Sequence, residues 1–297
     1  MKYQRHFGGA QSLGDRDGQE DGFGFYQPEA TVNTPERLLA VLADGMGGEA
    51  GGERASALAV DVFIQSFIDA VGAIPDRLQA ALLETDRWMA KTVREDPTLK
   101  GMGCTLLAVV VMPEGIHWIS VGDSLLYRIG PEAMERLNAD HSLGAELDAQ
   151  AEAGEISWEE ARNAKGRHQL LSAVTGHTLE RVDLREAPLP LQPGDRIILA
   201  SDGLLTLSAK EIAAIVRRHS RSLSSEELAQ FLVNAVVKKG TAGQDNTSVL
   251  VLIPRDAPGH GAEKTAFWKH RMGWLSLTLA ASLGLLAYDL WQRGFIP

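Results

Sequence analysis

The chain has 297 residues, of which 44% are hydrophobic and 23% charged, so it can bury a core and is not a disordered protein. Its net charge is −10. Because residues 255–297 carry +2, residues 1–254 carry −12, which argues against non-specific binding of nucleic acid. Cys104 is the single cysteine, so an intrachain disulfide is excluded and a reducing compartment is expected.

The first third of the chain predicts strands and turns followed by two long helices. The expected elements are strands at 22–27 and 37–43, a glycine-rich loop at 45–52, and helices at about 53–71 and 74–95. Ala59, Phe63 and Phe67 recur at four-residue spacing, which places them on one face of the first helix. Pro97 marks the end of the second helix.

The middle of the chain predicts a group of strands joined by short turns. Runs at 105–112, 116–121 and 125–129 have connections too short for crossovers, so we expect an antiparallel meander. The more polar stretch 138–168 predicts an irregular insertion with two short helices. The remaining expected elements are strands at 183–188, 196–200 and 246–253 and helices at 209–219 and 225–239. Hairpin-ordered strands with helices between the blocks favour the α+β class.

The C-terminal tail predicts a single membrane-spanning helix. An uncharged run of 17 residues begins at Met272 and ends at Tyr288. At ~1.5 Å per residue such a helix would measure about 26 Å, slightly less than a ~30 Å hydrocarbon core. Trp274 and Trp291 lie at its ends, where amphipathic aromatic side chains favour the membrane interface. The alternative is a core helix that docks on the domain, but an apolar surface all round favours the span.

The expected division of the chain follows from this tail. It comprises a folded domain at 1–254, a linker with basic juxtamembrane residues at 255–271, the transmembrane helix at 272–291 and a short tail at 292–297. Lys and Arg gather before the span, which predicts that the folded domain lies on the cytoplasmic side of the inner membrane. The polar N-terminus lacks the apolar stretch of a secretory signal.

Acidic residues stand at the edges of several apolar runs, each beside glycine or a small polar residue. They are Glu20, Asp44, Asp123, Asp202 and Asp245. A single Asp-Gly pair is usually only a turn, but strand ends can direct several carboxylates to one point. Hard divalent cations require such converging oxygen ligands. The set therefore predicts a metal site, and Arg16 beside it indicates that the metals meet a phosphate.

At these residues the chain resembles the metal-dependent protein phosphatases, also called PPM or type 2C serine/threonine phosphatases, and in particular their bacterial branch. The resemblance covers roughly residues 5–253. The matching stretches are Arg16-x-x-x-Glu20-Asp21, Ala43-Asp44-Gly45-Met46-Gly47-Gly48, Gly103-Cys104-Thr105, Val121-Gly122-Asp123-Ser124, Ala200-Ser201-Asp202-Gly203 and Asp245-Asn246-Thr247. The resemblance implies a four-layer αββα sandwich, in which helices flank two antiparallel sheets.

The resemblance also implies a role for each acidic residue in binding Mn²⁺ or Mg²⁺. Asp44 is expected to bridge two ions, and Asp202 and Asp245 to complete the first site. Glu20, through a water molecule, and the carbonyl of Gly45 are expected to serve the second site.

Two further residues are assigned by the same resemblance. Asp123 is the expected ligand of a third, weaker ion that it shares with Asp202, and Arg16 is expected to hold the substrate phosphate. The implied reaction is hydrolysis of phosphoserine and phosphothreonine in proteins by a hydroxide between two ions, without a covalent intermediate. The chemistry agrees, because two cations activate water and offset charge at phosphorus, and a guanidinium binds phosphate oxygens in pairs.

The chain departs from the family pattern at two positions. Met46 stands where many members have a histidine that protonates the leaving group, and a thioether cannot donate a proton. The general acid is then either a metal-bound water or His141, for which a turn-capping role is an equal alternative. Loss of a general acid typically lowers the rate about 10²–10⁴-fold. Gln19 replaces a usual asparagine, with little consequence. Residues 148–168 match the family's flap, and a solvated loop is the favoured interpretation of 166–168.

Two other functions remain as alternatives. A non-catalytic scaffold of the same fold could bind a phosphoprotein or kinase at the membrane, although it would not need Asp44, Asp202 and Asp245. A hydrolase of small phosphoesters is disfavoured, because the chain lacks a nucleotide-binding signature. The expected partner is a phosphoprotein, either a membrane-associated Ser/Thr kinase or its target.

Overall fold

The computed structural model describes residues 6–28, 37–219 and 222–253. No helix within these ranges is long and apolar enough to cross a membrane. The predicted linker, membrane helix and tail at 255–297 lie outside the described residues, and so does the last residue of the predicted domain.

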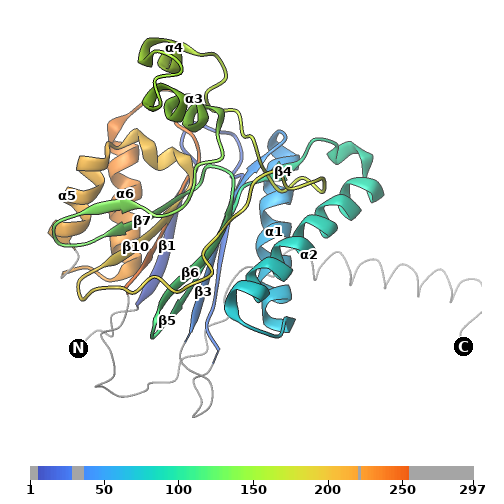
Figure 1. Ribbon diagram of the computed structural model, residues 1–297, viewed down its shortest axis with the longest axis horizontal. Coiled ribbons are helices and arrows are strands. Elements are labelled where there is room, and N and C mark those ends of the chain that lie inside the picture. The colour runs from blue at the N-terminus through green and yellow to red at the C-terminus, as the bar shows by residue number, and fades with distance from the viewer. Residues whose placement is uncertain (1–5, 29–36, 220–221, 254–297) are drawn as a thin grey trace, which may run out of the picture. The chain divides into compact units, whose positions relative to one another are not determined.

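The described residues form eleven strands, six α-helices and two short 3₁₀ turns (Figure 1). The strands are β1 Phe7–Ser12, β2 Asp21–Tyr26, β3 Leu38–Met46, β4 Gly103–Cys104, β5 Leu106–Met112, β6 Gly115–Val121, β7 Leu125–Ile129, β8 Met134–Arg136, β9 Asp183–Leu184, β10 Arg196–Ala200 and β11 Thr247–Leu252. The helices are α1 Glu49–Asp69, α2 Ile74–Glu95, α3 Leu143–Glu152, α4 Trp158–Asn163, α5 Ala209–His219 and α6 Ser225–Lys239, with 3₁₀ turns η1 Pro97–Leu99 and η2 Asp202–Thr206.

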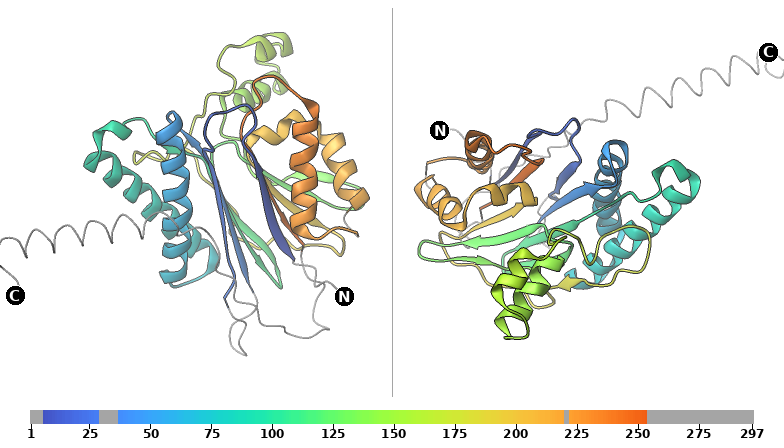
Figure 2. Two further views of the ribbon diagram at one scale, coloured as in Figure 1. Left: turned by 180° about the vertical axis from the view of Figure 1, so that it is seen from behind. Right: turned by 90° about the horizontal axis from the view of Figure 1, so that it is seen from above.

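Two antiparallel sheets lie face to face between two pairs of helices, which confirms the predicted arrangement (Figure 2). One sheet has the strand order β1-β11-β10-β7-β8, and the other has the order β2-β3-β5-β6-β9, with β4 paired to β3. Helices α1 and α2 cover the β3-containing sheet, whereas α6 packs on β1 and β11. The short helices α3 and α4 lie together at one end of the sandwich.

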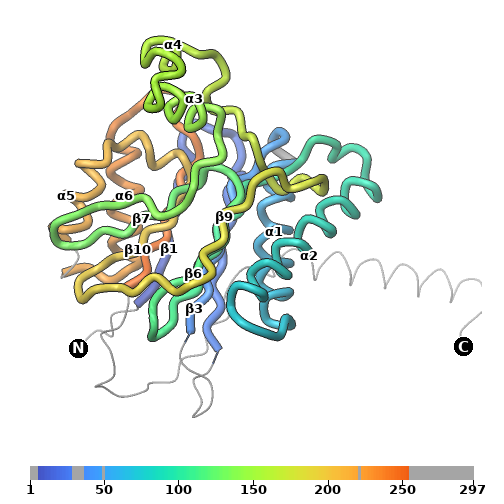
Figure 3. The backbone as a smooth tube through the Cα atoms, viewed as in Figure 1, coloured from blue at the N-terminus to red at the C-terminus, as the bar shows by residue number. Residues whose placement is uncertain are grey.

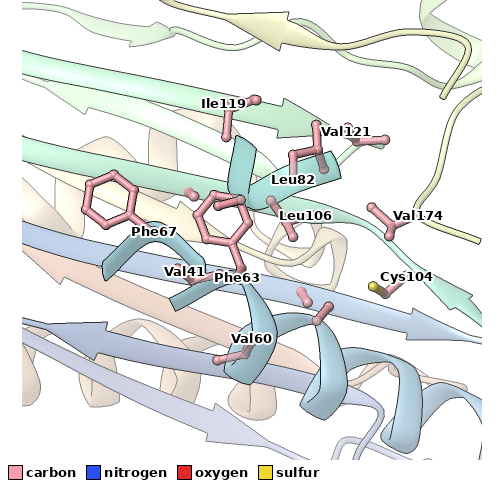
Figure 4. Packing of buried hydrophobic residues seen from close by; sticks show 14 of the residues in the cluster. Val41, Val60, Phe63, Phe67, Leu82, Cys104, Leu106, Ile119, Val121 and Val174 are labelled. Atoms are coloured by element: carbon pink, nitrogen blue, oxygen red, sulfur yellow. The ribbon is translucent and has the colours of Figure 1, made fainter. Parts of the chain in front are cut away.

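The layers follow from the alternation of side chains along each strand. In β3, Leu39 and Val41 face the helices, whereas Leu38 and Leu42 face the other sheet. All four are buried, so β3 is apolar on both faces. Figure 4 shows the helix side of this sheet, where Phe63 of α1 packs in the core with buried residues from the strands and from α2.

The predicted meander of three strands is wrong. Strand β6 pairs with β5 and β9, but β7 pairs with β10 and β8 in the opposite sheet. The chain crosses between the sheets at Gly122, whose φ of 101° is accessible chiefly to glycine. A Cβ at this position would lie 2.6 Å from Cγ2 of Thr105. The crossing brings Asp123 to the edge shared by both sheets, and Figure 3 follows the chain through it.

Helix α1 begins at Glu49, four residues before the predicted start and within the predicted glycine-rich loop. Glycine in a helix usually weakens it, but Gly52 is required here for close packing. A Cβ at Gly52 would lie 2.6 Å from the carboxyl carbon of Glu20. The two glycines that precede the helix, Gly47 and Gly48, both have positive φ. The loop is therefore only a short turn, and the first helical turn already borders the predicted site.

Candidate active site

One cleft gathers all seven residues that the sequence assigned to the site. It has a volume of about 940 Å³ and lies at the edge where β3, the β1–β2 loop, the β6–β7 crossing, η2 and the 243–246 loop meet. The predicted residues on its wall are Arg16, Glu20, Asp44, Gly45, Asp123, Asp202 and Asp245. Their individual roles stay predictions, but they share one space although the sequence separates them by up to 229 positions.

The end of β3 is held in place by Thr105. The backbone N–H of Thr105 donates to the carbonyl of Asp44 (2.8 Å), and the N–H of Asp44 donates to Oγ1 of Thr105 (3.0 Å). This hydroxyl also bonds Oγ of Ser124 at 2.7 Å, next to Asp123. The backbone that carries Asp44 is therefore coupled to the crossing that carries Asp123.

The surroundings of Gly45 leave no space for a side chain. Its N–H donates to the carbonyl of Glu20 (3.1 Å), and an added Cβ would overlap the carbonyl oxygen of Gly52. Glycine at this position therefore lets β3, the residue before β2 and the first turn of α1 approach one another.

Asn246 joins the two loops that carry the remaining polar residues. Its Oδ1 accepts from the N–H of Glu20 (2.7 Å), and its Nδ2 donates to the carbonyls of Leu13 (2.8 Å) and Gly18 (3.1 Å). The same loops are linked by Arg16, whose Nη2 donates to Oδ2 of Asp245 at 2.7 Å. The segment around Arg16 is therefore positioned by the segment around Asp245.

The carboxyl groups in the cleft destabilise one another's charged forms. Burial raises the pKa of Asp44 well above its usual value, and the charges of nearby aspartates, including Asp202 and Asp123, raise it further. Burial followed by the charge of Asp202 raises the pKa of Asp123 to about 6. Burial followed by the charge of Asp245 raises the pKa of Asp202, and nearby His168 and Arg16 only partly oppose this increase.

Asp21 lies beneath the cleft, and the sequence did not assign it a role. It pairs with Asp44 in the β2–β3 register. Its Oδ2 accepts from the hydroxyls of Ser201 (2.8 Å) and Ser248 (2.7 Å), whereas its buried Oδ1 has no hydrogen-bond partner among the residues that the structure describes. Burial raises the pKa of Asp21 to about 6. Its position directly after Glu20 was visible in the sequence, but its partners come from strand ends about 180 and 227 positions away.

The donor set of this cleft fits divalent cations. Hard cations take carboxylate and carbonyl oxygens, and the wall offers eight carboxylates, five of them from the predicted ligands, together with the backbone of Gly45. In the described part of the chain, the positive or ionisable nitrogen groups on this wall are Arg16 and His168, too few to balance those charges. The same part of the chain holds no group of three or more His, Cys, Asp or Glu side chains close enough to bind an ion by itself.

The structure distinguishes two histidines near the site. His141 is buried, its Nδ1 accepts from the N–H of Gly122 (3.2 Å), and burial lowers its pKa. It does not line the cleft, which favours the structural alternative over a general acid. His168 is exposed and lines the cleft together with Met46, so the end of the flap is part of the wall rather than a loop directed only to solvent.

Two antiparallel sheets with an acidic cleft at their shared edge agree with the arrangement expected of a metal-dependent phosphatase. Comparison with known families matches residues 20–236 to the family described as protein phosphatase 2C. The match covers more than half of the chain, so the chain belongs to the protein phosphatase 2C family.

Relatives and solved structures agree with this assignment. The chain is 30% identical over 255 residues to the serine/threonine phosphatase stp of Listeria monocytogenes, covering 82% of this chain and 93% of the relative. It is 32% identical over 232 residues to the serine/threonine protein phosphatase PstP of Mycobacterium tuberculosis, covering 75% of this chain and 41% of that protein. The crystal structure of the Mycobacterium tuberculosis phosphatase PstP/Ppp superposes with a TM-score of 0.68 at 29% identity, covering 84% and 98% of the two chains.

A further structure of the PstP catalytic domain contains two manganese ions. It superposes with a TM-score of 0.64 at 29% identity, covering 82% of this chain and 96% of that chain. Phosphatases of this family use Mn²⁺ or Mg²⁺. The chain is thus a protein serine/threonine phosphatase, which hydrolyses phosphate esters of serine and threonine in proteins.

Proposed function

We propose that this phosphatase binds two Mn²⁺ or Mg²⁺ ions in the cleft and a third more weakly. Asp44 would contact both tight ions, with Asp202 and Asp245 on the first and Glu20 and the Gly45 carbonyl on the second. Asp123 and Asp202 would hold the third. The observation that carries the proposal is the convergence of these residues, from separate segments, on one cleft. When bound, such ions lower the pKa of water and offset the negative charge of a phosphate under attack.

The chain's own residues would bind and orient the substrate phosphate. The guanidinium of Arg16 is about half exposed, so it can reach a ligand in the cleft while the β1–β2 loop stays in place. Asn246 fixes the loop through Leu13 and Gly18 without using the guanidinium. Arg16 therefore presents paired N–H donors that match two phosphate oxygens.

Titration calorimetry with Mn²⁺ tests the proposed ligands without relying on turnover. The full chain should bind two ions tightly, and Asp44→Asn should weaken both events because Asp44 is the shared ligand. Asp245→Asn should weaken one event only. Glu84→Gln, on the exposed face of α2, is the matched control and should leave both unchanged. Unchanged binding in Asp44→Asn would contradict the assignment.

We also propose that residues 272–291 tether the enzyme to the inner membrane, with the phosphatase domain in the cytoplasm. The support is the sequence alone, namely an uncharged run flanked by basic residues. A tether raises the local concentration of membrane-bound substrates, so a membrane-associated Ser/Thr kinase or its target would be the phosphoprotein partner. The full chain should stay with membranes after alkaline extraction, and the double variant Leu279→Arg with Leu283→Arg should be released. Equal release of both would contradict the tether.

A further inference from the structure

Residues 173–178, here named the strap, form a part of the cleft wall outside the predicted metal site. They follow the flap, and Ala173, Thr175 and Thr178 line the cleft. In Figure 1 the segment that follows α4 continues toward β4 and α2. The strap therefore lines the same cleft as the acidic residues, but it belongs to a different segment of the chain.

Backbone pairing holds one end of the strap beside the metal site. The N–H of Cys104 donates to the carbonyl of Val174 (3.1 Å), and the N–H of Val174 donates to the carbonyl of Cys104 (2.9 Å). Cys104 in turn pairs with Gly45 in the β3–β4 register. Val174 of the strap is thus paired with β4, and β4 is paired with β3, the strand that carries Asp44.

The middle of the strap is held by helix α2. Oδ1 of Asp86 accepts from the N–H of Gly176 at 2.8 Å, and the carboxylate also accepts from the N–H of Thr175. Gly176 has a φ of 78°, and an added Cβ would overlap the backbone of Ala90 on the same helix. The strap therefore lies directly against α2, and the two N–H groups have a carboxylate as their acceptor.

Among the described residues, the hydrogen bonds of Asp86 are to the strap, and the charge of His177, also in the strap, acts on its carboxyl. It is half-buried, and no lysine or arginine within the described ranges forms an ion pair with it. Burial raises its pKa, a cost that an exposed carboxylate would not carry, while the two backbone N–H groups lower it. The hydrogen bonds of Asp86 thus hold the strap against α2.

We propose that Asp86 is a positioning residue, which holds the strap as the wall that contacts the peptide chain beside the phosphorylated residue. The hydroxyls of Thr175 and Thr178 are the groups on this wall that can hydrogen-bond a peptide backbone. Asp86 itself lies outside the cleft and acts through the strap. The inference rests on the protein phosphatase activity, and it predicts an effect on peptide substrates that small phosphate esters do not share.

The test compares two substrates in the full chain with Mn²⁺: a phosphothreonine peptide and p-nitrophenyl phosphate, which carries no peptide. Asp86→Ala should lower the ratio of kcat/KM for the peptide to that for the small ester about tenfold, through the KM of the peptide, as expected for loss of a charged hydrogen bond. Asp86→Asn keeps one acceptor oxygen and should restore part of the ratio. Glu84→Ala, two positions earlier on α2, is the matched control.

An unchanged ratio in folded Asp86→Ala would overturn the proposal, and so would an equal loss with both substrates, which would indicate a merely structural role. If Asp86→Ala does not fold, Thr178→Ala tests the same wall, because Thr178 is exposed. It should lower the ratio, and an unchanged ratio would overturn the proposal. Failure of the wild-type chain to hydrolyse either substrate would instead contradict the phosphatase function itself.

Discussion

The guanidinium of Arg16 donates a hydrogen bond to the carboxylate of Asp245 over 2.7 Å, although 229 positions separate the two residues. One is the expected phosphate ligand, and the other is an expected ligand of the first metal. Under these assignments, this one contact would connect substrate binding with metal binding. Both side chains are about half exposed, so the contact positions the two groups more than it stabilises the fold.

Arg16→Ala should raise the KM for a phosphothreonine peptide about tenfold to a hundredfold, because it removes charged hydrogen bonds to the phosphate. Arg16→Lys should recover only part of this loss, since an ammonium group lacks the paired donors of a guanidinium. Steady-state kinetics at saturating Mn²⁺ provide the measurement. A KM that stays at the wild-type value in Arg16→Ala would show that another group binds the phosphate.

Gly203→Ala should destabilise the fold and reduce activity, because the new Cβ would overlap the carbonyl oxygen of Asn246. Overpacking of this kind costs about 1–3 kcal/mol. The measurement is the free energy of unfolding in urea. Gly18→Ala is the matched control for stability, since no atom of the described residues lies within 4 Å of its added Cβ. Equal stability of the two variants would show that the η2 backbone can move away from Asn246.

Without bound cations, the free energy of unfolding should fall as the pH rises from 5 to 7.5. Asp21 and Asp123 have a pKa of about 6 in the folded state, against a usual value of 3.8. The folded state therefore binds more protons, and the stability gained is fully present below about pH 3.8 and is lost as the pH rises through about 6. The two values imply on the order of 3 kcal/mol for each group.

Two other kinds of group do not reverse this trend. The lowered pKa of Glu211, about 2, affects stability only below the range measured. The lowered pKa of buried His141 acts in the opposite direction, but it is one group against the raised carboxyls of Asp21, Asp44, Asp86, Asp123 and Asp202. Urea unfolding with a chelator at both pH values provides the measurement, and Asp21→Asn should reduce the slope. Stability that rises with pH in the chelated protein would contradict the description of the cleft.

Phe63→Ala should lower the free energy of unfolding by about 3–5 kcal/mol, because the ring is fully buried between α1 and the β3-containing sheet. Leu83→Ala provides a comparison on α2, where the side chain is 46% exposed, and should cost much less. Urea unfolding of both variants with Mn²⁺ measures the difference. Similar losses in the two variants would argue against this core.

Of the secondary-structure elements, the amphipathic helices were predicted most accurately from the sequence. The bounds of α2, α5 and α6 matched at both ends, since an apolar face and clear end signals were local. Strand β1 was missed, because Phe7–Ser12 has two glycines and no alternation, and it is a strand only by pairing with β11. The partner of β7 was also predicted wrongly. A short connection does not specify which sheet the next strand enters.

The candidate site was predictable where each residue follows an apolar run, as Asp44, Asp123 and Asp202 do. Their convergence was expected from their positions at strand ends, whereas the role of each residue came from the family resemblance. Asp21 was not assigned a role, because its partners Ser201 and Ser248 are distant in the chain. Asp86 carried no signal, because in the sequence it resembles any polar residue of an amphipathic helix.

The most direct measurement of the central claim is phosphate release from a phosphothreonine peptide by the full chain. It should be made with Mn²⁺, with Mn²⁺ plus excess chelator, and with Asp44→Asn in Mn²⁺. The account predicts release that requires Mn²⁺ and is lost in Asp44→Asn, while the variant remains folded. Release that persists in the chelated protein or in Asp44→Asn would contradict the assignment of this cleft as a metal-dependent phosphatase centre.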